Sequence, residues 1–154
     1  MRTTIRLGTL ALLGILVACQ QKTAAPVETA ATPPPPPPLE ALATTRQVML
    51  GITIPTSDVV FQVGAHAPTN DTEWEKVAAN AAALAESGNL LTIGTRVVDQ
   101  QEWMTHAKAL IATAQEAEQA AQAKNVDKVL EVGDKIYEVC DACHKKYMAA
   151  RGGV

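Results

Sequence analysis

Apolar residues after Leu39 recur at intervals of three and four, the spacing that places them on one face of an α-helix. No segment shows the sustained alternation of apolar and polar residues that indicates a β-strand. The pattern predicts four helices, over about residues 39–51, 72–88, 99–124 and 125–148. Helices of this number and length pack as a bundle, so we predict an all-α fold in which residues 39–154 form a four-helix bundle.

Side chains that can cap a helix mark the expected starts. Thr72 and Glu75 are three residues apart, which is the spacing of a capping box. Asp99 and Glu102 repeat this spacing before the third helix. Asn125 is the expected cap of the fourth helix.

Glycine and proline mark two of the expected helix ends. The first helix is predicted to stop in the region 51–55, which contains Gly51 and Pro55, and the second near Gly88.

The residues predicted to face the core are Leu39, Leu42, Ala43, Val48, Met49 and Leu50 in the first helix, Trp74, Val77, Ala78, Ala81, Leu84 and Ala85 in the second, Trp103, Ala107, Leu110, Ile111, Ala114 and Ala117 in the third, and Val129, Val132, Gly133, Ile136, Tyr137, Cys140 and Tyr147 in the fourth.

These predicted core positions are mostly small. Aromatic residues make up only 3% of the chain, and alanine is frequent among the predicted core residues of the second and third helices. Alanine lets helices approach closely but buries little apolar area per residue, so the core of this bundle is expected to be thin. We therefore expect the fold to depend on a further apolar group held between the helices.

The last predicted helix carries the sequence Cys140-Asp-Ala-Cys143-His144. These three residues stand at i, i+3 and i+4, so two thiols and an imidazole project from one helix face within a single turn. This is the attachment pattern of c-type haem, in which the thiols form thioether bonds and the imidazole binds the iron. We predict one covalent haem c held by Cys140 and Cys143, with His144 as an iron ligand.

Three other uses of a Cys-X-X-Cys pair fit the sequence less well. A thioredoxin-like redox site requires a strand that leads into a helix, and no strand is predicted. A zinc site requires four ligands, whereas the only other histidines are His66 and His106, and no further cysteine follows the linker. A structural disulfide would leave His144 without a role.

The position of this motif near the C-terminus of a predicted four-helix bundle resembles the class II cytochromes c, the cytochrome c-prime family. The likeness covers about residues 39–150. Its specific features are the sequence Cys140-X-X-Cys143-His144-X-X-Tyr147 and an Arg46-Gln47 pair in the first helix. Met148 departs from the pattern, because many members have arginine there. The resemblance implies that the first helix covers the haem face opposite His144.

The resemblance leaves open which residue takes the sixth iron position. Low-spin members of the family use a methionine of the first helix, and Met49 is the only methionine in that predicted helix. High-spin members leave the sixth position open, and an apolar residue that follows an Arg-Gln pair by a few positions covers it. The same spacing after Arg46-Gln47 would place Leu50 over the iron. Met49 and Leu50 lie about 100° apart around a helix, so both cannot face the iron. We expect Met49 to be the ligand; the alternatives are an open site under Leu50 and ligation by His66 or His106.

The N-terminus has the layout of an export signal. Arg2 and Arg6 precede an apolar stretch that is too short to span a membrane. The sequence Leu16-Val17-Ala18-Cys19 looks like the lipobox of bacterial lipoproteins. Residues 1–18 are therefore predicted to be a signal peptide that is removed, and Cys19 is predicted to carry the acyl chains that anchor the protein to a membrane.

Residues 19–38 are expected to link this anchor to the bundle. They end in six consecutive prolines, Pro33–Pro38, which favour polyproline II and form a semi-rigid spacer of about 19 Å. Removal of residues 1–18 takes the 13 basic side chains to 11 against 16 acidic ones, a formal charge of about −5. This acidic balance, without basic clusters, excludes nucleic acid as a partner.

Together these features predict a mono-haem c-type cytochrome, lipid-anchored in the periplasm, that exchanges single electrons with redox proteins. An occupied sixth iron position favours electron transfer, whereas an open one favours binding of nitric oxide or carbon monoxide. No cluster of acid, base or nucleophile accompanies the motif, so an enzyme is not expected. The sequence leaves a homodimer open.

Overall fold

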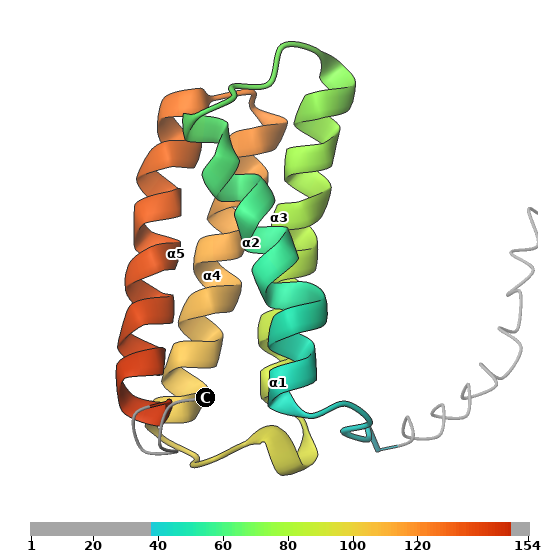
Figure 1. The fold of residues 1–154 in the computed structure, drawn as a ribbon, viewed down its shortest axis with the longest axis vertical. Helices are drawn as coiled ribbons and strands as arrows, with labels where there is room; N and C mark the ends of the chain where they lie inside the picture. The colour runs from blue at the N-terminus through green and yellow to red at the C-terminus, as the bar shows by residue number, and fades with distance from the viewer. Residues whose placement is uncertain (1–37, 149–154) are drawn as a thin grey trace, which may run out of the picture. The chain divides into compact units, whose positions relative to one another are not determined.

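A computed structural model of the chain describes residues 38–148. Four helical stretches pack side by side in this part (Figure 1), which confirms the predicted all-α four-helix arrangement. No helix among the described residues is long and apolar enough to cross a lipid bilayer. The predicted signal peptide, Cys19 and nearly all of the linker lie outside the described residues.

The first helical stretch is composite. It consists of α1 (Thr45–Val48), the π-helical segment η1 (Met49–Thr53), α2 (Ile54–Phe61) and the 3-10 turn η2 (Gln62–Gly64). Three helices follow, α3 (Asp71–Leu91), α4 (Glu102–Gln122) and α5 (Val126–Tyr147), with the 3-10 turn η3 (Gly94–Arg96) between α3 and α4.

The first helical stretch begins later in the chain than predicted. The helix begins at Thr45, and not at Leu39, because Thr44 closes a capping box. The Thr44 hydroxyl accepts from the backbone N–H of Gln47, and Oε1 of Gln47 accepts from the backbone N–H of Thr44 at 2.8 Å. Leu39 and Leu42 therefore precede the helix and are 76% and 89% exposed.

The same stretch also runs past Pro55, where it was expected to stop. The η1 segment forms a wider turn, closed by the N–H of Ile54, which donates to the Met49 carbonyl five residues back. Pro55 then falls in the first turn of α2. Its missing N–H is tolerated there, as it would be at any helix start, so the helical stretch continues to Phe61.

The cap of α3 lies two residues before the predicted one. Asn70, and not Thr72, caps the helix, and its side-chain oxygen accepts from the N–H of Glu73 at 3.0 Å. Glu73 Oε2 in turn accepts from the backbone N–H of Thr69 at 2.6 Å. These contacts close the helix end, so the pair formed by Thr72 and Glu75 lies inside it.

The starts of α4 and α5 agree more closely with the sequence pattern. Helix α4 begins at Glu102 rather than at Asp99, but the Asp99 carboxylate still accepts from the N–H of Trp103 at 3.1 Å. Asn125 caps α5 as predicted, and its side-chain oxygen accepts from the N–H of Lys128 at 3.0 Å.

Gly88 does not end a helix but allows two helices to approach. Helix α3 continues to Leu91, and Gly88 is buried against α4. A Cβ atom at position 88 would lie 2.7 Å from Ile111 Cγ1 and 3.2 Å from the Ala107 carbonyl oxygen. The absence of a side chain at this point therefore sets the separation of α3 and α4.

We expect Gly88→Ala to lower the free energy of unfolding by about 1–2 kcal/mol. The added methyl group overpacks the contact with Ile111, and this cost exceeds the roughly 1 kcal/mol by which alanine favours a helix over glycine. Gly51 is the matched control, because a Cβ atom there meets nothing within 4 Å. Urea unfolding should rank Gly51→Ala above Gly88→Ala in stability, and equal stability would contradict the close helix contact.

The core is built mainly from the predicted stripes. The predicted residues that are buried in α3, α4 and α5 are Trp74, Val77, Ala81, Leu84, Ala85, Trp103, Ala107, Leu110, Ala114, Ala117, Val129, Val132, Gly133 and Ile136. Tyr137 was predicted to face the core, but its side chain is 65% exposed. It follows buried Ile136 directly, and one residue turns a helical side chain by about 100° away from the core.

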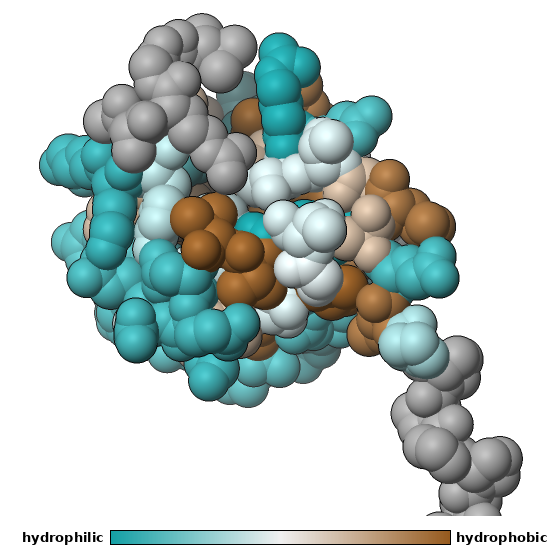
Figure 2. Space-filling model, turned by 90° about the horizontal axis from the view of Figure 1, so that it is seen from below, coloured by the Kyte–Doolittle hydropathy of each residue, from teal (hydrophilic) through white to brown (hydrophobic). Residues whose placement is uncertain are grey.

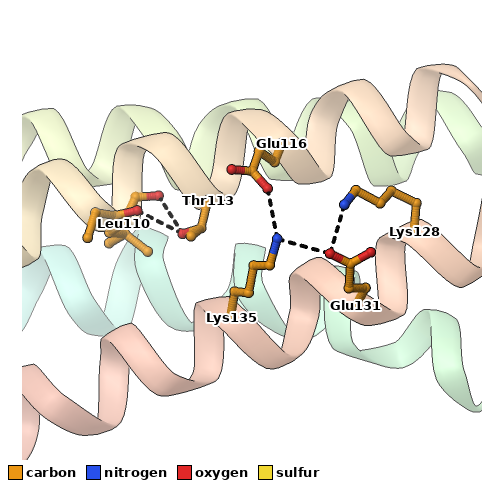
Figure 3. A network of polar contacts seen from close by, with 7 residues as sticks. Leu110, Thr113, Glu116, Lys128, Glu131 and Lys135 are labelled. Atoms are coloured by element: carbon orange, nitrogen blue, oxygen red, sulfur yellow. Dashed lines mark hydrogen bonds and ion pairs between the residues drawn. The ribbon is translucent and has the colours of Figure 1, made fainter.

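Ion pairs join α4 and α5 on their solvent side (Figure 3). Lys135 Nζ lies 3.4 Å from Glu116 Oε2 on α4 and 3.0 Å from Glu131 Oε1 on its own helix. Lys128 Nζ lies 2.8 Å from the same Glu131 oxygen. All four side chains are well exposed to solvent, so each pair stabilises the fold by at most about 1 kcal/mol. The apolar core, and not this network, holds α5 against α4.

Candidate functional site

Two apolar cavities lie beside α5, and their walls share several residues. The first has a volume of about 170 Å³ and the second of about 330 Å³. The residues that line both are Met49, Ile54, Trp103, Cys143 and His144. The cavities therefore border the same turn of α5, which is the turn that carries the cysteine and histidine motif.

Helix α5 presents the whole motif to this space. It runs without a break from its Asn125 cap to Tyr147, so the predicted helical spacing of the motif is present. Cys140 lines the first cavity, and Cys143 and His144 line both. Both cysteines are half-buried free thiols, whereas the His144 side chain is exposed.

The two thiols are held in their neutral form. Burial raises the pKa of Cys140, and burial together with the nearby Cys140 raises the pKa of Cys143 to about 11. Thiol–disulfide exchange proceeds through the thiolate, whose fraction falls as the pKa rises, so this environment disfavours a thioredoxin-like role. Within residues 38–148, no group of three or more histidine, cysteine, aspartate or glutamate side chains is arranged to hold a metal ion.

Met49 lies on another wall of the same cavities. It is the first residue of η1, it is half-buried against the core, and it lines both cavities. Leu50 lines only the second cavity and is 53% exposed. Arg46 also borders the second cavity, whereas Gln47 is used in the helix cap. The geometry thus gives Met49 more access than Leu50 to the space beside His144.

The two remaining histidines are separated by the fold. His106, on α4, lines the first cavity together with Met49 and His144. His66 follows η2 and lines a different cavity, to which neither Met49 nor any motif residue contributes. His106 therefore stays near the candidate site, and His66 does not.

The second cavity lies at the end of the bundle where α1 begins and α5 ends. Its lining includes Thr45 and Arg46 from α1 and Met148 just after α5. Figure 2 views this end of the bundle and shows apolar side chains exposed among hydrophilic ones. Leu50 and Met148, which both line the cavity, are 53% and 47% exposed. An apolar cavity with an exposed apolar rim suits a large apolar ligand.

Tyr147 fixes the turn of α5 that carries His144. Its hydroxyl donates to Asp99 Oδ2, and its ring lies edge-on to the ring of Trp103 with 5.1 Å between the centroids. The Trp103 indole N–H donates in turn to the Leu91 carbonyl at 2.8 Å. The end of α5 is therefore tied to the segment before α4 and to the end of α3. Asp99 was recognised in the sequence only as a cap, because nothing local links it to a tyrosine 48 residues later.

These contacts shift two pKa values in opposite directions. The hydrogen bond from Tyr147 and the N–H of Trp103 hold the pKa of Asp99 below its ordinary 3.8. Burial, and then the contact with Asp99, raises the pKa of Tyr147 to about 12. A carboxyl group whose pKa is lowered by folding adds stability that is present above its ordinary pKa and is lost as the pH falls through the lowered value.

We expect Tyr147→Phe to lower the melting temperature by roughly 2–6 °C at neutral pH, because it removes one hydrogen bond. This deficit should stay constant above about pH 5 and shrink as the pH falls below about 4 toward the lowered pKa of Asp99, where the carboxylate of the folded protein is protonated. Tyr137→Phe is the control, since Tyr137 is 65% exposed and should leave the melting temperature unchanged. Thermal melts between pH 3 and pH 7 measure both effects. Equal melting temperatures for the two variants at pH 7 would contradict a stabilising Asp99 contact.

Comparisons with known proteins leave the family open. No protein-family model matches the chain, and neither a curated protein nor a solved structure is similar enough to count as a match.

Proposed function

We propose that the chain is a mono-haem c-type cytochrome that carries single electrons, with the haem attached at Cys140 and Cys143 and the iron held by His144 and Met49. The observation that carries this proposal is that Met49 on η1 and all three motif residues on α5 line the first apolar cavity, and that Met49, Cys143 and His144 also line the second. Haem, when bound, would supply a reversible one-electron couple between ferric and ferrous iron.

The chemistry of the cavity walls fits a porphyrin. Apolar side chains from several helices surround the motif, among them Ile54, Phe61, Leu91, Trp103 and Leu110. Such walls would exclude water from the faces of the macrocycle. The thiols stand one helical turn apart, which suits attachment at two points, and the adjacent imidazole suits binding of the iron. His144 is exposed in the chain alone, and a bound porphyrin would cover it.

The position of Met49 favours electron transfer over gas binding. A sulfur ligand opposite His144 would leave no open coordination position for nitric oxide or carbon monoxide, and it would stabilise ferrous iron. The alternative, a gas-binding protein with Leu50 over an open iron, is less well supported because Leu50 is more than half exposed and lines only the second cavity. The apolar side chains exposed at this end of the bundle (Figure 2) are where a redox protein of the periplasm would approach.

The cellular setting rests on the sequence pattern alone. We propose that Cys19 is lipidated after removal of residues 1–18 and that residues 19–38 hold the bundle away from the membrane surface. This arrangement would place the cytochrome in the periplasm, where thioether-linked haem can meet membrane-bound and soluble redox partners.

Absorption spectra of the purified protein in both oxidation states test the proposal. A covalent haem that resists acidic organic extraction, together with low-spin ferric iron and the weak near-infrared sulfur-to-iron band, would support it. A protein that retains no haem would refute the cytochrome assignment. A high-spin protein that binds carbon monoxide rapidly would replace electron transfer by gas binding.

A further inference from the structure

The hydroxyl oxygen of Thr53 is the only buried side-chain oxygen or nitrogen in the described part of the chain that lacks a hydrogen-bond partner. Thr53 is 4% exposed, and it lines the first cavity together with Met49 and His144. Buried hydroxyl groups in proteins are nearly always bonded, because an unmade bond is not replaced by water. A buried hydroxyl without a partner on a cavity wall therefore indicates that another group completes its bonding.

The other buried hydroxyl groups in the described helices, those of Thr56, Ser57 and Ser87, bond to their own backbone. Thr56 donates to the Ile52 carbonyl at 2.7 Å, and Ser57 donates to the Ile54 carbonyl at 3.0 Å. Figure 3 shows the same arrangement for Thr113, whose hydroxyl lies 3.2 Å from the Leu110 carbonyl. This backbone contact is the usual behaviour of serine and threonine within a helix.

Thr53 differs from these residues, and it is the last residue of the π-helical segment. The carbonyl four residues before it belongs to Met49, and this carbonyl accepts from the N–H of Ile54 in the widened turn. The Thr53 hydroxyl is buried and makes no bond to it, and Thr53 lines the first cavity. Single π turns inside helices often occur at functional sites. Here the π turn contains both Met49 and the free hydroxyl.

We propose that Thr53 is the hydrogen-bond donor beside the sixth iron position, and that its hydroxyl donates to Sδ of Met49 when this sulfur binds the iron. The inference rests on the proposed function and adds a residue that tunes it. A thioether sulfur retains a lone pair when it binds a metal, and it can accept a weak hydrogen bond. Donation to this lone pair draws electron density from the sulfur, which disfavours ferric iron more than ferrous iron. Thr53 is thus a positioning and tuning residue that raises the reduction potential.

The test compares three variants of the haem-containing protein. Thr53→Val keeps the shape of the side chain and removes the hydroxyl, and Thr53→Ser keeps the hydroxyl. Thr56→Val is the matched control, because the Thr56 hydroxyl is also buried but already donates to backbone carbonyls. We expect the ratio of ferrous to ferric protein at a fixed applied potential to fall about twofold to tenfold in Thr53→Val, as for the loss of one hydrogen bond. The near-infrared band should shift in the same variant, and Thr53→Ser and Thr56→Val should resemble the wild type.

The outcomes separate this inference from the proposed function. If the wild type shows the near-infrared band and Thr53→Val alters neither the band nor the ratio, Thr53 has no such role and Met49 ligation stands. If the wild type lacks the band, Met49 ligation is wrong and the inference falls with it. If Thr53→Val does not fold with its haem, Thr53→Ala is used instead. The inference then requires a lower ratio of ferrous to ferric protein in Thr53→Ala than in Thr53→Ser.

Discussion

Replacement of Met49 by leucine should open the iron of the haem-containing protein to carbon monoxide and lower its reduction potential. Leucine fills a similar volume but has no sulfur, so the sixth position would lose its ligand while the wall keeps its apolar surface. The near-infrared sulfur-to-iron band should disappear. The rate of carbon monoxide binding to the ferrous protein should rise by a factor on the order of ten or more, because no ligand must first dissociate. Absorption spectroscopy, redox titration and stopped-flow mixing measure these changes.

Met104 offers a matched control for this experiment. It is a half-buried methionine of α4 that packs against the core and lines neither cavity. Met104→Leu should leave the band, the potential and the rate of carbon monoxide binding unchanged. If Met49→Leu behaves like Met104→Leu, Met49 does not bind the iron. A high-spin wild type would then favour Leu50 as the cover of an open site.

A haem-free protein in which Cys140 and Cys143 are both serine should lose most of its cooperative thermal transition. Seven of the nineteen buried apolar residues in the described core are alanine. The two cavities beside the motif are lined mainly by apolar side chains, and a porphyrin held between them would remove this apolar surface from water. The whole stability of a small domain is only about 5–15 kcal/mol, so loss of this burial is expected to be a large fraction of it. Helical content should therefore decline gradually on heating.

Circular dichroism melts of the double serine variant and of the haem-containing wild type provide the comparison. Cys140→Ser alone keeps Cys143 and His144, so it should retain one attachment point and melt between the two. A haem-free double variant that melts as sharply as the wild type would show that the helices need no group between them. The attribution of the thin core to a missing cofactor would then be wrong.

Local patterns in the sequence predict the helices well where the decisive contacts are local. The Asn125 cap and most of the stripe on α5 follow from residues three and four apart, and the structure confirms the cap and the buried positions Val129, Val132, Gly133 and Ile136. Gly88 was misread because its role depends on Ile111 of another helix. Pro55 was misread because a π turn, which has no recognised sequence signal, restarts the helix just before it.

The residues of the candidate site also divide into those that local spacing predicts and those that depend on contacts between distant parts of the chain. Helical spacing alone predicts that Cys140, Cys143 and His144 share one face of α5, and all three border the cavities. The contact of Asp99 with Tyr147 and the unbonded hydroxyl of Thr53 depend on tertiary packing and a local change of helix type, so no sequence pattern reveals them. The haem itself and the lipid anchor stay predictions from the sequence motifs.

The π turn also explains how the first helical stretch keeps one face toward the core along its whole length. Its buried residues fall at Val48, Thr53, Thr56, Ser57, Val60 and Val63. The step of five between Val48 and Thr53 is one residue longer than an α-helical turn, and the later steps return to ordinary helical spacing. The segment thus holds one additional residue without changing the phase of the helix on either side. Deletion of one residue within η1 would restore a continuous α-helix and leave the core face of α2 in register. It would, however, bring the Met49 carbonyl back into ordinary α-helical hydrogen bonding and remove the local geometry that sets Met49 and Thr53 on the cavity wall.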